Sequence, residues 1–389
     1  MRFIIRSIRN TYRDMDKWLL WISMVVIIYG LLNIVTASSS EAVTSQAPLY
    51  YYFYQHSKML AIAFLGSLFI INIDTKRYSG VAFILYFVIL GLLIYLSRFG
   101  VAHRGSINWI RIAGVTFQPS ELAKPVMIVC LSLVFEKFYR KFKNKRISHT
   151  DMLGIVFVVG LIYPVIIFLQ KDLGTALIIT SIFGVMFLTS PILAKEKLVW
   201  IGRLFIVLIL GFLIMLSVKG YILSDEQLDR FNFFNPCSNY EEGGYQTCNG
   251  FIAINDGGLL GLGPGKSKQK YSYIPEPHTD SVFAIIVEEN GLILSTIIFI
   301  CYYFILKRIL MLASVASTIR GRYICIGTAT YMFMHILINL GGLFGIMPLT
   351  GVPLPFLSYG GSFTVSLIMM LAVVQRVHIE TRRQKIEIK

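Results

Sequence analysis

The sequence predicts an all-α polytopic membrane protein with about ten transmembrane helices. Its 389 residues are 56% hydrophobic and only 15% charged, and their mean hydropathy is +0.68. A soluble fold of this composition would leave a large apolar surface in water. Because the apolar stretches recur along the whole chain and leave no soluble block larger than one loop, we expect one membrane domain over residues 1–389.

Ten apolar windows approach the length that a helix needs to cross a bilayer, roughly 20 residues. They cover residues 18–35, 59–73, 81–96, 122–135, 152–169, 174–188, 200–218, 282–306, 323–340 and 362–374. Basic residues precede the first window, as in a signal peptide, but this window is long enough to span and we interpret it as a retained helix. Polar residues that flank the shorter windows can continue each helix into the headgroup region.

The distribution of Lys and Arg predicts the orientation of these helices. Basic residues gather in alternate segments, at 76–77, 137–146, 195–197 and 307–322, and again in the N-terminal residues 1–17 and the tail 375–389. The positive-inside rule places these segments and both termini in the cytoplasm. The opposite face then receives the loop after residue 35, residues 97–121, the turn 170–175, the long loop 219–280 and residues 341–361. This scatter of charge also argues against a nucleic-acid partner, although the net charge is +15.

Residues 104–124 combine cationic side chains with an aromatic residue, at Arg104, Trp109 and Arg111. We expect a helix to begin at residue 119 or 120, because Pro suits a first turn and Ser120 can cap it. Lys124 then lies one turn into the membrane, where a charge is costly unless it is paired or functional. One interpretation is an anion-binding cation, and the alternative is an ion pair with Glu121 at i−3.

Lys171 and Asp172 form a polar turn between two apolar runs, at the expected tip of a helical hairpin. Charged side chains within membrane helices commonly belong to functional sites. The alternative is that both residues only mark the membrane interface.

The long loop carries closely spaced glycines and then lysines, at Gly257, Gly258, Gly261, Gly263, Gly265, Lys266, Lys268 and Lys270. Glycines let backbone N–H groups approach an anion, and lysines on this face run against the positive-inside rule. A Walker phosphate loop is excluded, because its first glycine would fall on Leu260. The segment is therefore either an anion cradle or a flexible solvated loop.

The same loop ends in Tyr-Ile-Pro-Glu-Pro-His-Thr-Asp at residues 273–280 and leads directly into an apolar run. Asp280 is therefore expected at a helix N-terminus, where the helix dipole favours its ionised form. It is a candidate for chemistry, and the alternative role is a helix cap. Glu288 follows on roughly the same helical face, while Glu289 points elsewhere, and acids inside an apolar span are rarely without function.

Residues 345–362 contain Pro348, Pro353 and Pro355 among glycines and apolar residues. The segment is too broken for a full span and too apolar for a solvent loop. This pattern predicts a re-entrant or interfacial segment that lines a cavity.

Cys237 and Cys248 share the long loop, and their spacing fits no compact zinc motif. A disulfide is one interpretation if the loop faces an oxidising compartment. Two free thiols are the alternative, and this is the interpretation that we favour.

Together these motifs resemble the SEDS family, the FtsW, RodA and SpoVE proteins of bacterial division, elongation and sporulation. The similarity runs from residue 109 to residue 375 and depends on Gln-Pro-Ser-Glu at 118–121, Asp-Leu-Gly-Thr at 172–175, Pro-Glu at 275–276 with His-Thr-Asp at 278–280, Glu-Glu at 288–289, and Thr-Gly-Val-Pro-Leu-Pro-Phe-Leu-Ser-Tyr-Gly-Gly-Ser at 350–362. The sequence departs from the family pattern at Lys171, Pro277, Ser281 and Asn290. The run 265–271 looks more like division-type FtsW proteins than like RodA.

The resemblance implies ten transmembrane helices around an extracytoplasmic cavity, in the bacterial cytoplasmic (inner) membrane. It implies a peptidoglycan glycosyltransferase that polymerises lipid II into glycan strands, in septal wall synthesis for an FtsW-type protein or in elongation for a RodA-type one. The implied partners are a class B penicillin-binding protein, which crosslinks the strands, and other division or elongation membrane proteins. The essential Asp of the family's long loop corresponds to Asp280.

The implied reaction joins a GlcNAc 4-hydroxyl to a MurNAc anomeric carbon with inversion, and a lipid diphosphate leaves. Asp280 is the candidate base, and the diphosphate needs positive charge. We expect substrate binding by Lys124, Arg111, Arg104, Trp109, Lys171, Asp172, His278, Glu288 and Ser358, with the lysines at 266–270 as further candidates. A divalent cation, Mg²⁺ or Mn²⁺, can share this role, although no metal-ligand motif is visible. The rival hypotheses are a lipid II flippase, which needs no base, and a non-catalytic scaffold.

Overall fold

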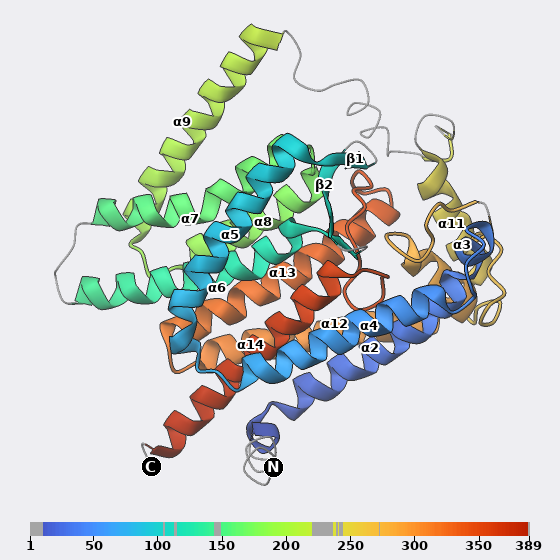
Figure 1. Ribbon diagram of the computed structural model, residues 1–389, viewed down its shortest axis with the longest axis horizontal. Coiled ribbons are helices and arrows are strands. Elements are labelled where there is room, and N and C mark those ends of the chain that lie inside the picture. The colour runs from blue at the N-terminus through green and yellow to red at the C-terminus, as the bar shows by residue number, and fades with distance from the viewer. Residues whose placement is uncertain are drawn as a thin grey trace.

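The computed structural model describes residues 11–103, 106–112, 115–143, 149–219, 236–238, 240, 244–271 and 273–387. Long helices dominate these ranges and form a bundle (Figure 1). They are α2 (Lys17–Ala37), α4 (Tyr51–Ile71), α5 (Tyr78–Phe99), α6 (Pro119–Lys143), α7 (His149–Leu169), α8 (Leu173–Thr189), α9 (Ala194–Lys219), α12 (Val282–Val315), α13 (Ile319–Leu343) and α14 (Ser362–Glu387). Each predicted window coincides with one of these helices, which confirms the polytopic helical fold.

The exposed surface of the bundle is suited to lipid. Six helical segments in the described residues are long and apolar enough to cross a membrane: α2, α4, α5 together with the turn η1 (Thr75–Arg77), α12, α13 and α14. The apolar parts of α7 and α8 are shorter. Large apolar side chains such as Trp21, Phe69 and Phe87 are 58%, 71% and 66% exposed, which a water-soluble surface would not tolerate in such number. The chain is therefore a multi-pass membrane protein.

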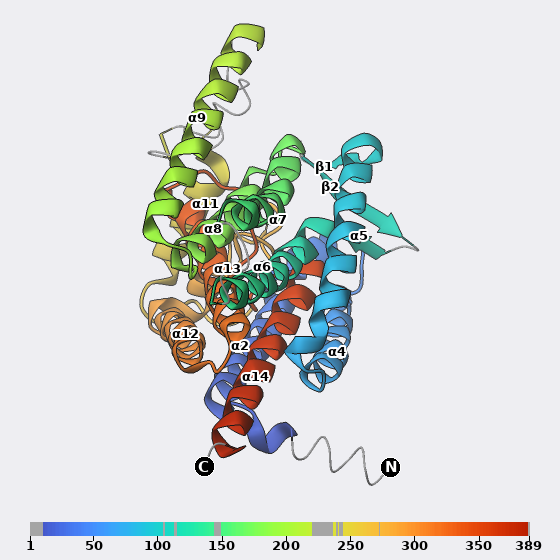
Figure 2. The ribbon, with the colours of Figure 1, turned by 90° about the vertical axis from the view of Figure 1, so that its left-hand side faces the viewer.

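The core of the bundle lies around α13 and α14. α13 contacts α6, α8, α12 and α14, while α4 packs on α14 from the outside. α9 extends away from the other helices in both views (Figures 1 and 2).

Ion pairs join the helices at the end that we predict to be cytoplasmic. Arg308 of α12 donates two hydrogen bonds to the Asp16 carboxylate before α2, at 2.9 and 2.6 Å. Burial alone would raise the pKa of Asp16, but the hydrogen bonds from Arg308 and the Leu19 N–H, together with nearby positive charge, outweigh it and the pKa is lowered. Arg320 of α13 binds Glu136 of α6 at 2.5 Å and Thr75 at 2.9 Å. These pairs hold four distant segments of the chain at one end of the bundle.

The opposite end carries elements that the sequence analysis did not predict. Three short strands, β1 (Val101–His103), β2 (Ser106–Ile112) and β3 (Val115–Phe117), form an antiparallel sheet in the order β1-β2-β3. Two short helices, α3 (Ser39–Thr44) and α11 (Tyr245–Gly257), complete this end. The partial alternation of polar and apolar residues within β2 is the signal that would have indicated a strand. The all-α prediction thus holds for the membrane helices, with a small extramembrane sheet added.

α12 is interrupted at Gly291, whose φ of 79° and ψ of 169° are not helical. The segment after α11 enters this break: Leu262 and Gly263 donate backbone hydrogen bonds to the Glu288 and Glu289 carbonyl oxygens, both at 2.9 Å. In return Leu292 donates to the Gly258 carbonyl at 2.9 Å. The glycines allow this close approach, because a Cβ on Gly291 would lie 2.4 Å from the Leu259 carbonyl oxygen. The glycine-rich segment is therefore a fixed insert in α12, and the flexible solvated loop is wrong for it.

Candidate functional site

Asp280 lies just before α12 and is only 6% exposed. The helix begins at Val282 with Ser281 as its N-cap residue, so the alternative role of Asp280 as the helix cap is wrong. Its Oδ1 accepts hydrogen bonds from Thr279 Oγ1 at 3.1 Å and from Gln246 Nε2 at 3.4 Å. The carboxylate is thus held by its own loop and by α11.

The last loop, residues 344–361, lies directly against Asp280. Asn339 at the end of α13 donates from Nδ2 to the carbonyl oxygens of Asp280 at 2.7 Å and of Val352 at 2.8 Å. A Cβ built on Gly351 would lie 3.8 Å from Asp280 Oδ2, and the φ of +68° at Gly351 favours glycine. One amide therefore joins the candidate base to the loop that faces it.

Lys124 of α6 is fully buried and forms an ion pair with Glu121 at 2.6 Å, so the ion pair expected as the alternative is present. Its Nζ also lies 3.0 Å from His335 Nε2, and His335 Nδ1 lies 3.1 Å from the Pro353 carbonyl oxygen. Because the ammonium only donates and the carbonyl only accepts, both contacts are satisfied by neutral His335 with its proton on Nδ1. Lys124 is thereby connected through His335 to the same loop that faces Asp280.

Asp172 caps α8, since its Oδ1 accepts from the Thr175 backbone N–H at 3.1 Å. Its Oδ2 accepts from Asn108 of β2 at 2.8 Å and from Gln118 at 3.2 Å. The backbone N–H of Gln118 in turn donates to Ser362 Oγ at 3.1 Å. Asp172 therefore fastens the hairpin tip to the sheet and to the start of α14.

Lys171, beside Asp172, has an exposed side chain and a φ of 62°. This left-handed conformation is uncommon for a residue other than glycine. The prediction of a helical hairpin tip at 170–175 is confirmed, because α7 ends at Leu169 and α8 begins at Leu173. The ammonium of Lys171 remains available at this end of the bundle.

His278 is 3% exposed and packs against the rings of Tyr52 and Tyr359, with centroid distances of 4.6 and 5.3 Å. Burial lowers the pKa of His278 to about 4, so the ring is neutral. Its carbonyl oxygen accepts from the Tyr359 backbone N–H at 2.8 Å. Ser358, next to Tyr359, is buried and accepts from the Leu354 N–H at 2.7 Å, which closes a turn of the last loop.

The acids that follow Asp280 hold the long loop. Glu288 is completely buried and accepts from Ser267 Oγ at 2.5 Å and from the Lys268 N–H at 2.7 Å. Glu289 binds Lys270 Nζ at 2.8 Å. Lys270 is thus neutralised, whereas the side chain of Lys268 is exposed, as is that of Lys266.

The remaining predicted residues belong to the sheet and the start of α6. Trp109 on β2 is 39% exposed. Arg104 lies outside the described residues, and so does the side chain of Arg111, although its backbone pairs with Thr116. α6 begins at Pro119 as predicted, but Ser120 is no cap, because its buried Oγ has no hydrogen-bond partner.

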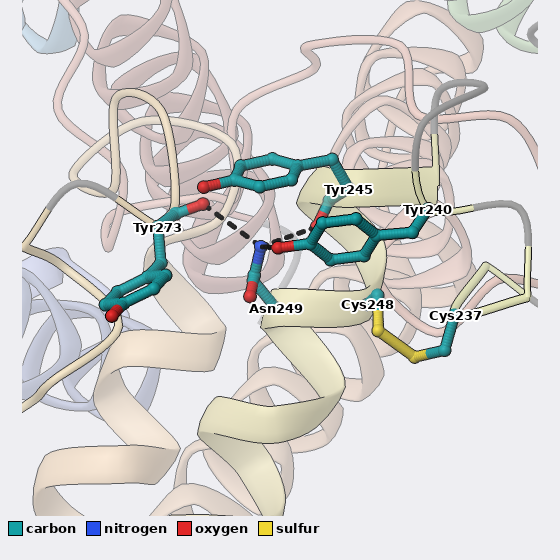
Figure 3. Close-up of a disulfide and its surroundings, with 6 residues drawn as sticks. All are labelled: Cys237, Tyr240, Tyr245, Cys248, Asn249 and Tyr273. Atoms are coloured by element: carbon teal, nitrogen blue, oxygen red, sulfur yellow. Dashed lines mark hydrogen bonds between the residues drawn. A yellow bond between two sulfur atoms is a disulfide. The ribbon is translucent and has the colours of Figure 1, made fainter.

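Cys237 and Cys248 form a disulfide with a Cα–Cα distance of 4.9 Å, so the favoured prediction of free thiols is wrong (Figure 3). Cys248 is on α11, and the bridge ties the preceding part of the long loop to that helix. Beside it, Asn249 donates from Nδ2 to the Tyr245 carbonyl oxygen at 2.9 Å and to that of Tyr273 at 3.3 Å. Sequence spacing allowed this pairing, but only the fold of α11 brings the two cysteines together.

The structure brings the regions predicted to be extracytoplasmic to one end of the bundle. Gln246, His335 and Asn339 connect these regions, and none of the three was among the predicted site residues. His335 and Asn339 stand at i and i+4 in an apolar run, and polar residues at such positions are a recognisable signal. Within the described residues no three His, Cys, Asp or Glu side chains gather as a metal site, so the divalent cation gains no support from a contact.

Comparison with known proteins finds one family along nearly the whole chain. The model of the FtsW/RodA/SpoVE family, described as a cell cycle protein, matches residues 17–383. Stage V sporulation protein E of Bacillus subtilis is 29% identical over 367 residues, which cover 93% of this chain and 96% of that protein. The FtsW protein of Dichelobacter nodosus, named a probable peptidoglycan glycosyltransferase, is 31% identical over 391 residues, covering 96% of this chain and 92% of its own.

Solved structures share the fold. One of them is described as "Structural coordination of polymerization and crosslinking by a peptidoglycan synthase complex". A chain of that structure matches with a TM-score of 0.73 and 23% sequence identity, and the match covers 94% of this chain and 98% of that chain. The rod shape determining protein RodA of Thermus thermophilus has a TM-score of 0.66 at 23% identity, covering 94% of this chain and 96% of RodA.

Proposed function

Because this chain belongs to the FtsW/RodA/SpoVE family, we propose that it is a peptidoglycan glycosyltransferase that polymerises lipid II. The observation that carries the proposal is the placement of Asp280, a buried carboxylate held at the point where α11, α12 and the last loop meet. Several relatives are FtsW proteins named as probable peptidoglycan glycosyltransferases, which supports a role in septal wall synthesis.

In the proposed reaction Asp280 takes the proton from the 4-hydroxyl group of a GlcNAc residue. The oxygen then attacks the anomeric carbon of MurNAc, and the lipid diphosphate leaves with the bonding electrons. Attack from the face opposite the leaving group inverts the configuration, so an α-linked donor yields a β-linked polymer. A single carboxylate suffices as base here, unlike in hydrolases, where two carboxyl groups flank the bond.

Positive charge must balance the diphosphate as it leaves. Exposed Lys171, Lys266 and Lys268 are the described cations that could contact it, and Arg104 and Arg111 remain candidates. Lys124 is buried and paired, so we assign it a different part: it holds the last loop through His335. Asp172, Glu288 and Ser358 likewise hold the loops around the substrate. A cation that travels with the diphosphate, Mg²⁺ or Mn²⁺, would add to this balance.

The proposal places the protein in the bacterial cytoplasmic membrane with both termini inside and Asp280 outside. The basic clusters at 137–146 and 307–322 support this orientation. A class B penicillin-binding protein is the proposed partner. Its support is the fold shared with a chain from a peptidoglycan synthase complex.

The test is polymerisation of purified lipid II by the full chain in lipid vesicles, read as glycan on a gel. Asp280→Asn keeps the size of the side chain but removes the proton acceptor, so we expect folded protein and no polymer. Asp256→Asn on α11 is the matched control, because it removes a carboxylate from the same end of the protein, and it should polymerise normally. Polymer from Asp280→Asn at the wild-type rate would remove the catalytic assignment.

The flippase hypothesis gives a different result in the same vesicles. A flippase moves the lipid II headgroup across the bilayer without forming polymer, and Asp280→Asn should leave that transfer unchanged. A scaffold would do neither, and cells carrying Asp280→Asn would grow.

A further inference from the structure

Gln246 stands in the first turn of α11 and reaches the start of α12. Its Nε2 donates to Ser281 Oγ at 2.9 Å and to Asp280 Oδ1 at 3.4 Å. Thr279 Oγ1 donates to the same carboxylate oxygen at 3.1 Å. One of these donors is the residue next to Asp280, whereas Gln246 comes from a separate helix 34 residues earlier.

α11 is held in place from several sides. The disulfide to Cys237 fixes its first turns, and Asn249 binds the Tyr273 carbonyl oxygen of the loop that leads to Asp280 (Figure 3). A Cβ on Gly250 would lie 2.9 Å from Leu343 Cδ1, and a Cβ on Gly257 would lie 2.2 Å from the Val287 carbonyl oxygen. The helix therefore packs tightly on both α12 and α13, and the side chain of Gln246 is presented from a fixed base.

We propose that Gln246 is a positioning residue, which holds the Asp280 carboxylate in the plane required for proton abstraction. The inference rests on the proposed function, since it names a second residue that serves the same base. A donor on Oδ1 from outside the Asp280 loop restricts rotation of the carboxylate about its terminal torsion angle, which has a broad energy minimum. A donor also favours the ionised form, which is the form that accepts a proton.

The experiment measures polymer formation by the full chain from lipid II in vesicles, as kcat and KM over a range of pH. Gln246→Ala should lower kcat on the order of 10- to 100-fold with little change in KM, because the base is misplaced. The acid limb of the rate profile should move up by about half to one pH unit, because the ionised carboxylate loses a donor. A loss of helix packing alone would not move that limb.

Asn249→Ala is the matched control. It removes a buried amide from the next turn of α11 that binds Tyr245 and Tyr273 but does not contact Asp280. We expect a lower melting temperature and an acid limb at the wild-type pH. Equal profiles for the two variants would overturn the positioning role of Gln246.

If Gln246→Ala does not fold, Gln246→Glu keeps the volume and replaces the donor by a carboxylate that faces Asp280. In Gln246→Glu the acid limb of the rate profile should move to a higher pH than in the wild type, by more than the shift expected for Gln246→Ala. An acid limb at the wild-type pH would also overturn the inference. Wild-type protein that makes no polymer would instead overturn the proposed function itself.

Discussion

The Nζ atom of Lys124 lies 3.0 Å from His335 Nε2, and it is the same ammonium that binds Glu121 at 2.6 Å. Both contacts lie within the helix bundle, where the charged groups of Lys124 and Glu121 are buried away from water. A charge in such a place is tolerated only with its partner present. The loop that faces Asp280 is therefore supported by an ion pair that must stay complete.

The first prediction concerns this pair. Lys124→Met replaces the apolar part of the side chain but not the ammonium and leaves the Glu121 carboxylate unpaired, which should destabilise the protein by about 3–5 kcal/mol. The double variant Glu121→Gln with Lys124→Met removes both charges and should regain most of that loss. Melting temperatures in detergent measure both, and a single Lys124→Met variant as stable as the wild type would contradict the prediction.

The second prediction concerns the break in α12. Gly291→Ala should destabilise the protein by about 2 kcal/mol or more, because φ of 79° with ψ of 169° suits glycine alone and a Cβ would lie 2.4 Å from backbone atoms of the inserted segment. Gly184→Ala in α8 is the matched control, since a Cβ there has nothing within 4 Å. It should be neutral or stabilising by up to about 1 kcal/mol. Similar unfolding curves for the two variants would show that the insert does not need the glycine.

The sequence was sufficient for the helices and for their order. Each span is indicated locally by an apolar run bounded by polar residues. Asp280 stands at the polar boundary of the run that begins at residue 282, so its position before α12 could be predicted in the same way. The sheet was missed because β2 is short and only partly alternating. α11 was missed because Asn249, Gly250 and Asn255 weaken its apolar periodicity.

The contacts of the site could not be predicted in the same way. Asp280 meets Gln246, Asn339 and Gly351 through long-range contacts, and no local pattern specifies which amide will reach which carboxylate. The lysines show the same limit: Lys270 is neutralised by Glu289, while Lys268 stays exposed, although both stand in one run. A charged residue can therefore be named as a candidate ligand from the sequence, but whether it is free to bind one depends on its partner in the fold.

The third prediction concerns stability in acid. Burial lowers the pKa of His278 from 6.5 to about 4 in the folded protein. Between these values the unfolded chain takes up a proton that the folded chain does not, so stability is fully present above pH 6.5 and falls as the pH drops toward 4, by about 3 kcal/mol in total. His278→Gln cannot titrate, and its melting temperature should fall less over this range than that of the wild type. If the melting temperatures of the two proteins changed with pH in parallel, His278 would not be buried as a neutral ring.

The fourth prediction concerns orientation. Lys268→Cys and Lys195→Cys both place a thiol at an exposed position, on the loop before Asp280 and at the start of α9 respectively. A membrane-impermeant maleimide added to intact cells should label the first and not the second, because the positive-inside rule assigns them to opposite faces. Permeabilised cells are the control, in which both should be labelled. The reverse pattern in intact cells would place Asp280 in the cytoplasm.

The last prediction concerns the disulfide between Cys237 and Cys248. The chain has five cysteines, and Cys130, Cys301 and Cys325 are free. Denatured protein treated with an alkylating reagent should therefore gain three labels without reduction and five after it, as counted by mass spectrometry. Five labels without reduction would show that the bridge does not form. Where it does form, it closes a loop with a sequence separation of 11 residues, and replacing both cysteines by Ala should lower stability by up to about 3 kcal/mol, because the unfolded chain regains the entropy of that loop.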